Sequence, residues 1–367
     1  MEKNPTVPKR FWLITYPRTG SNLLIRMLGI DKQSNVTTGN QLGGNFFLPP
    51  FTTIWPKGLF RKEFAQWAED EARRLKEEYE VCFIQLQTLL DAAAAEGKTV
   101  FFKEHIGPLI EPAKLCNHVA IASASTISSA DSTQVKTSPE PNWQLGTSSS
   151  TAAAESAHTN TTMLPDAFLR TWYPTFIIRH PARAYLSYLR ALRETHFDGT
   201  SPFSPADESA TPIDIWSQGC MTLHWTRKLY EWYTAEFELQ RQAQVQAEAE
   251  VGPWPVILDA DDIMRGTDVV VRYVQILGLD MSKLSFSWDA ADKKQVEKMD
   301  PNAQRFLSTL LDSKEVDQGK IAGDIDLDVE AKAWREEFGE PAAKILEASV
   351  RRAMADYEFL KARRLKA

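Results

Sequence analysis

The sequence contains few cysteines: only Cys82, Cys116 and Cys220 occur among its 367 residues. They are far apart and lack metal-ligand spacing, so the sequence predicts neither a disulfide framework nor a zinc site. We interpret them as reduced thiols that pack as small hydrophobic groups. Such cysteine use is typical of a protein that stays in the cytoplasm.

Long hydrophobic runs and an excess of basic residues are also missing. The apolar stretch at residues 11–15 is too short for a signal-peptide core or a transmembrane helix. A net charge of -7 argues against a general nucleic-acid-binding protein. It still allows a small anionic ligand, because one pocket can be basic in an acidic chain. We therefore expect a cytoplasmic protein without a nucleic-acid or membrane partner.

Strand and helix patterns alternate along the chain. Buried parallel strands are predicted at four short apolar runs rich in β-branched or aromatic residues, namely 11–15, 99–103, 175–178 and 255–258. Helices are predicted at 61–95, 213–250 and 269–277, and from about residue 303 onward. This alternation predicts an α/β fold, a three-layer sandwich with a central parallel sheet flanked by helices.

Residues 122–160 break this pattern, because more than half of them are Ser, Thr or Ala. A segment with so few large apolar side chains cannot bury enough surface to offset the entropy of ordering, so it predicts a disordered surface insertion. The full chain is 43% hydrophobic, which is enough apolar material for one large core or two modest ones. We expect a single domain over residues 1–367, with a helical C-terminal part from about residue 303.

The strongest local signal is residues 16–24, Tyr-Pro-Arg-Thr-Gly-Ser-Asn-Leu-Leu, which join a predicted strand to a helical pattern. A tight turn at such a junction directs backbone N–H groups and the positive end of a helix at an anion. Gly20 lets the backbone approach closely, Ser21 and Asn22 add donors, and Arg18 adds charge. The loop is not a Walker A motif, because the first glycine and the Lys-Ser/Thr pair are missing. An ordinary strand-to-helix turn with an exposed arginine is the alternative.

Two other predicted strands end in residues suited to the same ligand. Lys103 and His105 share one face by the two-residue alternation of a strand, and ligands of open α/β sheets bind at such strand ends. A neutral histidine there can accept a proton from a hydroxyl. Arg179 ends another strand, and Ser187 follows about two helical turns later, which suits a second phosphate. Purely structural roles for these side chains are the alternative.

Taken together, these segments resemble the sulfotransferases that use 3′-phosphoadenosine 5′-phosphosulfate (PAPS). The 5′-phosphosulfate loop of that family is similar to residues 16–24, and its Lys-x-His strand end is similar to residues 103–105. Its 3′-phosphate motif, an arginine followed eight positions later by a serine, resembles Arg179 and Ser187. A fainter similarity reaches the acidic turn 259–262. The whole pattern looks like a fungal branch often associated with secondary metabolism.

The resemblance implies a P-loop NTPase-like sulfotransferase fold and transfer of a sulfuryl group to a hydroxyl of a small-molecule acceptor, without a metal. His105 would be the general base, while Lys103 and Arg18 would stabilise charge on the transferring group and the leaving phosphate. The donor would be bound by Arg18, Thr19, Gly20, Ser21, Asn22, Arg179 and Ser187.

The sequence departs from the family at several places. Arg18 stands where many members have lysine, and Leu23 stands where many have an adenine-stacking tryptophan. The later Arg-Lys-Gly element has no clean match, since the pair at 319–320 is too short to carry a role. Asp259 mimics a Walker B aspartate, so a P-loop nucleotide-binding protein is one alternative. A repurposed member that performs an elimination or cyclisation is another.

The acceptor site has the weakest signal. An aromatic cluster follows the first predicted helix and contains Phe46, Phe47, Phe51 and Trp55. These rings fit either the core or the wall of an acceptor pocket. The sequence names neither the acceptor nor the oligomeric state.

Overall fold

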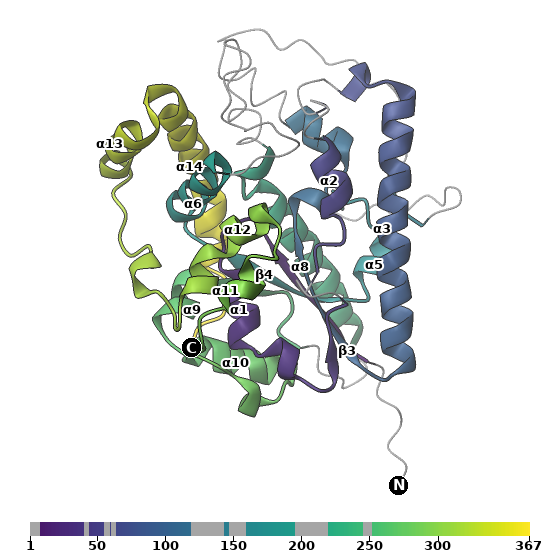
Figure 1. Cartoon of the computed structure of the whole chain (residues 1–367). Coiled ribbons are helices and arrows are strands. Elements are labelled where there is room, and N and C mark those ends of the chain that lie inside the picture. Colours follow the sequence, from purple (N-terminus) through teal and green to yellow (C-terminus); the bar gives the residue numbers. More distant parts are fainter. Residues whose placement is uncertain are drawn as a thin grey trace.

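Five parallel strands form the centre of the fold (Figure 1). The computed structural model describes residues 8–39, 44–54, 59, 64–118, 143–146, 159–194, 219–244 and 252–367. The strands are β1 Arg10–Thr15, β2 Val36–Thr37, β3 Thr99–His105, β4 Tyr173–Ile178 and β5 Val256–Asp259. Their order in the sheet is β2-β3-β1-β4-β5, and all paired strands run parallel. The α/β fold class and the four predicted strands are confirmed, whereas the two-residue edge strand β2 was not foreseen.

Helices cover both faces of this sheet (Figure 1). The α-helices are α1 Ser21–Met27, α2 Leu48–Ile54, α3 Glu69–Ala95, α5 Asp166–Leu169, α6 Pro181–Arg193, α8 His224–Gln244, α9 Ala260–Arg265, α10 Asp268–Leu277, α11 Lys293–Val296, α12 Pro301–Asp312, α13 Leu327–Phe338 and α14 Glu340–Lys361. Short 3-10 helices are η1 Ile30–Lys32, η3 Phe64–Gln66, η4 Gly107–Leu109, η5 Met281–Lys283 and η6 Gln318–Lys320. The long helix α3 lies along one side of the molecule, and the hairpin of α13 and α14 lies on the opposite side (Figure 1).

The helix predictions at 61–95, 213–250 and 269–277 hold for the described residues with changed boundaries, whereas the predicted C-terminal helical part is interrupted by non-helical residues at 313–317 and 321–326. The pattern at 61–95 forms α3 from Glu69, and the pattern at 213–250 contains α8. The helix α10 ends at Gly278, whose φ of 68° suits a residue without a side chain. The C-terminal helical part begins with α12, two residues before the predicted position, because Asp300 caps it by accepting a hydrogen bond from the backbone N–H of Ala303.

The register of the sheet brings the ends of the central strands together. Thr15 at the end of β1 pairs with His105 at the end of β3. On the other side of β1, Ile14 pairs with Phe176, two residues before β4 ends. Parallel pairing therefore places the loops after β1, β3 and β4 at one edge of the sheet.

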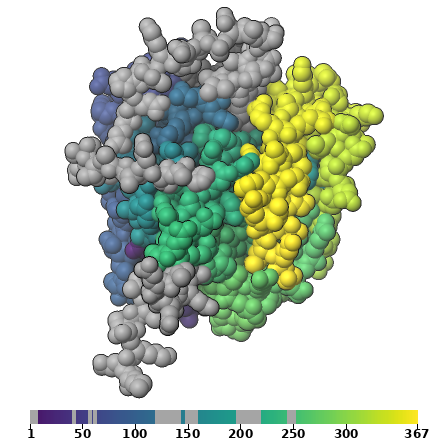
Figure 2. Space-filling model, turned by 180° about the vertical axis from the view of Figure 1, so that it is seen from behind, coloured from purple at the N-terminus to yellow at the C-terminus, as the bar shows by residue number. Residues whose placement is uncertain are grey.

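The core lies between the sheet and the helices. Residues 11–15 of β1 are fully buried, and the rings of Trp12, Phe102 and Trp172 contact one another at centroid distances of 5.4 to 5.7 Å. Cys82 and Cys116 are buried free thiols and Cys220 is a half-buried one. On the far face, α14 lies beside α8 and both cover the sheet (Figure 2).

Most of the predicted insertion at 122–160 lies outside the described residues. Its described part at 143–146 buries Trp143 and Leu145 in the core, so this stretch is not a surface loop as the composition of the segment suggested. These two apolar residues pack because α3 and its neighbours offer them rings such as that of Phe64. Among the described helices, none has the length and apolar character that crossing a membrane requires.

The central position of β1 predicts a large effect of truncation there. Leu13 is fully buried, so Leu13→Ala should lower the free energy of unfolding by about 2–5 kcal/mol through lost contacts and a residual cavity. The shift of the urea midpoint at constant slope measures this effect. Ile84→Ala is the matched control, because this side chain on α3 is 58% exposed and should change stability by only about 0.5 kcal/mol. Equal effects of the two substitutions would contradict the described packing of β1.

Candidate functional site

A cavity of about 1330 Å³ lies at the edge of the sheet where β1, β3 and β4 end. It exceeds the pockets of about 300–1,000 Å³ that hold drug-sized ligands, so its volume allows more than one small molecule. Every site residue predicted from the sequence lines it, namely Arg18, Thr19, Gly20, Ser21, Asn22, Lys103, His105, Arg179 and Ser187. The structure thus brings the three predicted segments to one place.

The loop after β1 makes a tight turn. Arg18 and Gly20 have positive φ angles of 69° and 81°. A Cβ at position 20 would meet no atom within 4 Å, so there is space for a side chain there. Glycine is favoured at this position because of its left-handed backbone conformation. Buried Thr19 donates a hydrogen bond from Oγ1 to the carbonyl of Tyr16, 3.1 Å away. The Tyr16 hydroxyl donates to the carbonyl of Arg179 and accepts from its N–H at 3.1 Å. These bonds fix the loop against the end of β4.

Lys103 is an almost fully buried cation beside this loop. Its Nζ donates a hydrogen bond to Oδ1 of Asn22 over 3.0 Å. Burial lowers the pKa of Lys103 to about 8, although the nearby Glu104 carboxylate opposes this shift. The lysine is therefore mostly protonated at neutral pH and able to release a proton more easily than an exposed lysine.

His105 is held neutral at the end of β3. Burial, followed by the charge of Lys103, lowers its pKa to about 3. Its Nδ1 lies 2.5 Å from Oγ1 of Thr15, and that hydroxyl donates to the carbonyl of Glu104 over 3.3 Å. The neutral ring carries its proton on one of its two nitrogens. In the tautomer with the proton on Nδ1, this nitrogen donates a hydrogen bond to Oγ1 of Thr15, and Nε2 keeps its lone pair.

Four cations that line the cavity lie close enough to interact electrostatically: Arg18, Arg179, Arg305 and Lys320. Arg179 donates from Nη1 to the carbonyl of Arg18 at 3.0 Å and from Nη2 to the carbonyl of Lys320 at 2.8 Å, while its buried Nε has no partner among the described residues. Arg18 donates from Nε to Oγ of Ser187 at 3.0 Å and from Nη1 to the carbonyl of Phe306. We call these four residues the cation cluster.

The members of the cation cluster repel one another. Burial is the largest cause that lowers the pKa of Arg18 to about 10, and the charges of Arg179 and Arg305 add to it. Burial also lowers the pKa values of Arg179 and Lys320. Within the described part of the chain, no carboxylate oxygen lies within 4.0 Å of the side-chain nitrogens of Arg18, Arg179 or Lys320. An anionic ligand would relieve this repulsion.

Arginines nearer the rim of the cavity are paired with carboxylates. Arg183 lies 3.2 Å from Glu330, and Arg190 lies 2.7 Å from Glu337, both glutamates belonging to α13. Arg305 of the cation cluster pairs with Glu194 at 2.6 Å. The lining cations without a carboxylate partner among the described residues therefore include Arg18, Arg179 and Lys320, which favours an anion bound beside them.

Sequence reasoning missed two members of the cation cluster. Lys320 belongs to the Gly-Lys pair that was noticed and assigned no role. Arg305 lies on α12 with no local motif to mark it. The guanidinium of Arg18 donates hydrogen bonds to Ser187 and Phe306, so it lies with the predicted phosphate-binding residues.

Asp259, which resembles a Walker B aspartate, is absent from the described lining of the cavity. Its carboxylate is buried, with Oδ1 accepting a hydrogen bond from the backbone N–H of Asp261 and Oδ2 accepting one from the hydroxyl of Tyr357, each at 2.9 Å. Both carboxylate oxygens of Asp259 therefore accept hydrogen bonds within the fold, which indicates a structural role. The described residues contain no group of three or more His, Cys, Asp or Glu that could hold a metal ion.

No protein-family model matches the chain. It is 35% identical over 371 residues to "Sulfotransferase ppzF" of Metarhizium rileyi (strain RCEF 4871), an alignment that covers 100% of this chain and 99% of that protein. It is 36% identical over 372 residues to "Sulfotransferase ppzF" of Metarhizium majus (strain ARSEF 297), with 100% of both chains covered. A solved structure, the sulfotransferase domain of the Synechococcus PCC 7002 olefin synthase, matches at 13% identity and a TM-score of 0.35 over 93% of this chain and 98% of that domain, a score too low to support a structural comparison.

The pKa of Lys103 predicts how stability depends on pH. Because the folded state lowers this pKa from 10.5 to about 8, the unfolded chain binds more protons between these values, and stability rises with pH across that window. Below about pH 8 the buried ammonium destabilises the fold. We therefore expect Lys103→Met to raise the free energy of unfolding at pH 7 by about 1–3 kcal/mol.

Urea unfolding at pH 7 and at pH 10.5 measures this effect. The gain in Lys103→Met should shrink at the higher pH, where the lysine of the parent protein is neutral in the folded state and half protonated in the unfolded state. Lys98→Met is the control, because this side chain is 40% exposed and paired with Glu96 at the surface. A variant at position 103 that is less stable than the parent protein at pH 7 would contradict the destabilising burial of Lys103.

Proposed function

This chain belongs to the sulfotransferase family, and we propose that it transfers a sulfuryl group from PAPS to a hydroxyl of a small-molecule acceptor. The observation that carries the proposal is the cation cluster, unpaired at its buried members, in one cavity with a neutral histidine. PAPS bears a 5′-phosphosulfate and a 3′-phosphate, so it supplies anionic groups at two ends of one adenosine. The cavity offers cations for both ends.

Donor binding would use the two sides of the cavity differently. The 5′-phosphosulfate would lie against the loop after β1, where Thr19, Gly20, Ser21 and Asn22 line the cavity. The 3′-phosphate would lie against Arg179, with Arg18, Ser187, Lys320 and Arg305 bringing further charge and hydrogen-bond donors. Arginine suits phosphate because its planar fork donates two parallel hydrogen bonds.

The transfer step follows from the state of His105. Nε2 of the neutral ring would take the proton of the acceptor hydroxyl while the acceptor oxygen attacks sulfur. The bond between sulfur and the bridging oxygen of the 5′-phosphate breaks, and its electron pair stays on that oxygen. Thr15 would hold the ring in the required tautomer through Nδ1. Catalysis of this kind rests mainly on positioning and on charge stabilisation.

Lys103 would stabilise the leaving phosphate. Its pKa of about 8 keeps it mostly charged at neutral pH, and a bound anion would raise this pKa further by Coulomb attraction. Arg18 can contribute charge but does not readily release a proton, so Lys103 is the better proton donor to the leaving oxygen. With Lys103 as the proton donor and Arg18 as a source of positive charge, the proposed reaction is compatible with an arginine at position 18.

The acceptor would bind on the apolar side of the cavity. Leu48, Phe51, Ile106 and Trp225 line this side. The Phe51 ring lies beside Gly107, two residues after His105. A Cβ at position 107 would be 3.5 Å from Cζ of Phe51. Of the aromatic cluster noticed in the sequence, Phe46 and Phe47 pack against Phe102 and Tyr79, and Trp55 lies outside the described residues. A cytoplasmic setting, supported by free cysteines, and a role in fungal secondary metabolism complete the proposal.

Nucleotide binding without magnesium tests the donor. We expect adenosine 3′,5′-bisphosphate to bind in the presence of EDTA and to raise the melting temperature with the logarithm of its concentration above Kd, since it binds only the folded state. Thermal shift and isothermal titration calorimetry measure this. Stabilisation by magnesium-ATP alone would instead favour a P-loop nucleotide-binding protein.

Arg179→Ala is the matched variant. It should bind adenosine 3′,5′-bisphosphate about 10- to 100-fold more weakly, because a charged hydrogen-bond donor to the 3′-phosphate is lost. Its affinity for adenosine 5′-phosphosulfate, which lacks the 3′-phosphate, should stay close to that of the parent protein. Equal losses for both nucleotides would contradict the assignment of Arg179.

His105→Ala tests the general base. We expect it to bind adenosine 3′,5′-bisphosphate normally and to lose about 100- to 10,000-fold in kcat for sulfate transfer, because a positioned base contributes that much. Mass spectrometry of sulfated product from a panel of phenols and alcohols measures the rate. Unchanged turnover would remove His105 from the mechanism. Tight donor binding with no sulfated product in the parent protein would favour a repurposed member that performs an elimination or cyclisation.

A further inference from the structure

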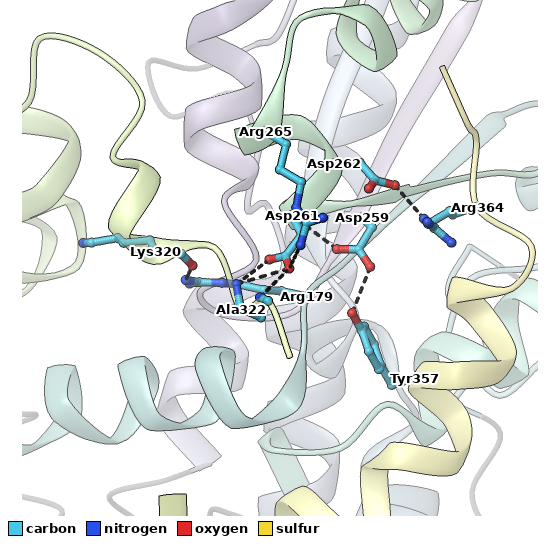
Figure 3. A network of polar contacts seen from close by, with 10 residues as sticks. Arg179, Asp259, Asp261, Asp262, Arg265, Lys320, Ala322, Tyr357 and Arg364 are labelled. Carbon is cyan, nitrogen blue, oxygen red and sulfur yellow. Dashed lines mark hydrogen bonds and ion pairs between the residues drawn. The ribbon is translucent and has the colours of Figure 1, made fainter. Parts of the chain in front are cut away.

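An acidic turn follows β5, and its three carboxylates have different partners (Figure 3). Asp259 accepts from Tyr357 of α14. Asp262 pairs with Arg364 in the C-terminal tail, with 2.5 Å between Oδ2 and Nε. Asp261 instead accepts hydrogen bonds from backbone N–H groups of the segment that follows η6. The sequence drew attention to this turn, and the proposed reaction uses none of its residues.

Asp261 is bonded to two successive backbone amides. The N–H of Ala322 lies 3.0 Å from Oδ1 and 3.2 Å from Oδ2, and the N–H of Gly323 lies 3.4 Å from Oδ2. The side chain is buried, and it is absent from the described lining of the cavity. Its ion pair with Arg265 is long, at 3.8 Å. The main partner of this carboxylate is therefore the backbone at 322–323.

The segment held by Asp261 carries a member of the cation cluster. Lys320 precedes Ala322 by two residues, and its carbonyl accepts the 2.8 Å hydrogen bond from Nη2 of Arg179 (Figure 3). Gln318 fastens the same segment to α9 by donating from Nε2 to the carbonyl of Met264 at 2.7 Å. Residues 321–326 lie between η6 and α13, where Ile321 donates a backbone hydrogen bond to the carbonyl of Gln318 and Asp326 caps α13. The carboxylate is thus a tether for this piece of chain.

We propose that Asp261 is a positioning residue for the phosphate site, which clamps residues 320–323 so that Lys320 and Arg179 face the 3′-phosphate together. The inference rests on the proposed function and adds to it a residue that touches no ligand. Charge-assisted bonds to backbone N–H groups are among the stronger hydrogen bonds, so a single carboxylate can hold the segment. Loss of the clamp removes the carbonyl that orients Arg179.

The clamp and simple electrostatics predict opposite results. A carboxylate close to Arg179 weakens the attraction of the site for an anion, so neutralising it without other change should strengthen phosphate binding. Loss of the clamp should weaken phosphate binding, because Lys320 and Arg179 are no longer aligned. The sign of the change in affinity therefore separates the two effects.

Asp262 offers a matched control on the adjacent residue. It belongs to the same turn and carries the same charge, but it pairs with Arg364 rather than with the segment at 320–323. Asp262→Ala removes one carboxylate and one ion pair while leaving the clamp in place. Differences between the variants at positions 261 and 262 report on the clamp.

The experiment compares Asp261→Ala and Asp262→Ala in the full chain. Calorimetry gives Kd for adenosine 3′,5′-bisphosphate and for adenosine 5′-phosphosulfate, and steady-state assays give KM for PAPS and kcat. For Asp261→Ala we expect Kd of the bisphosphate and KM of PAPS to rise about 10-fold or more. Affinity for adenosine 5′-phosphosulfate and kcat at saturating PAPS should change by less than about twofold, and Asp262→Ala should leave all four near the parent values.

Asp261→Asn replaces the alanine variant in this test if the alanine variant does not fold. It keeps the size of the side chain and one acceptor oxygen, so it should show the same loss of affinity at smaller magnitude. Unchanged or tighter binding of the bisphosphate in the variants at position 261 would overturn the clamp. Equal losses for the two nucleotides would overturn it as well, because the role would then be structural. Failure of the parent protein to bind either nucleotide would overturn the proposed function itself, and this inference with it.

Discussion

Mutual repulsion among buried and half-buried cations is the constraint on which the cavity depends. Arg18, Arg179 and Lys320 come from three distant parts of the chain, and none of them has a carboxylate partner within 4.0 Å in the described structure. Apart from Nε of Arg179, which has no partner among the described residues, their guanidinium and ammonium groups donate to backbone carbonyls and hydroxyls, such as the carbonyls of Phe306 and Lys320. Carbonyl dipoles orient these cations without cancelling their charge, so the attraction for an anion is preserved.

The surrounding carboxylates are placed where they support the cluster and do not neutralise it. Those at the rim pair with Arg183 and Arg190, which lie outside the cluster. Those after β5 lie behind the cavity wall, where Asp259 fastens α14 and Asp261 fastens the segment that carries Lys320. The fold thereby separates the charges that stabilise it from the charges that are left for a ligand.

Burial lowers the pKa values of Lys103 and His105, just as it lowers that of Arg18 in the cation cluster. The desolvation that lowers the pKa of Arg18 also lowers that of Lys103 to about 8 and that of His105 to about 3. One physical cause thus provides anion attraction, a lysine that can give up a proton and a histidine that can accept one. In the proposed reaction these are the three requirements of sulfuryl transfer.

The sequence by itself determined the α/β class, four strands, the loop after β1 and the positions of Lys103, His105 and Arg179, because these follow from short-range patterns of two or about four residues. The pairing of Thr15 with His105 depends on strand register, which no local pattern contains. Arg18 meets the carbonyl of Phe306 across 288 residues of chain, and Lys320, Arg305 and Asp261 join the site in the same long-range manner. Only tertiary packing decides such contacts, since side chains far apart in sequence come together solely through the way the helices and the sheet bury their apolar faces.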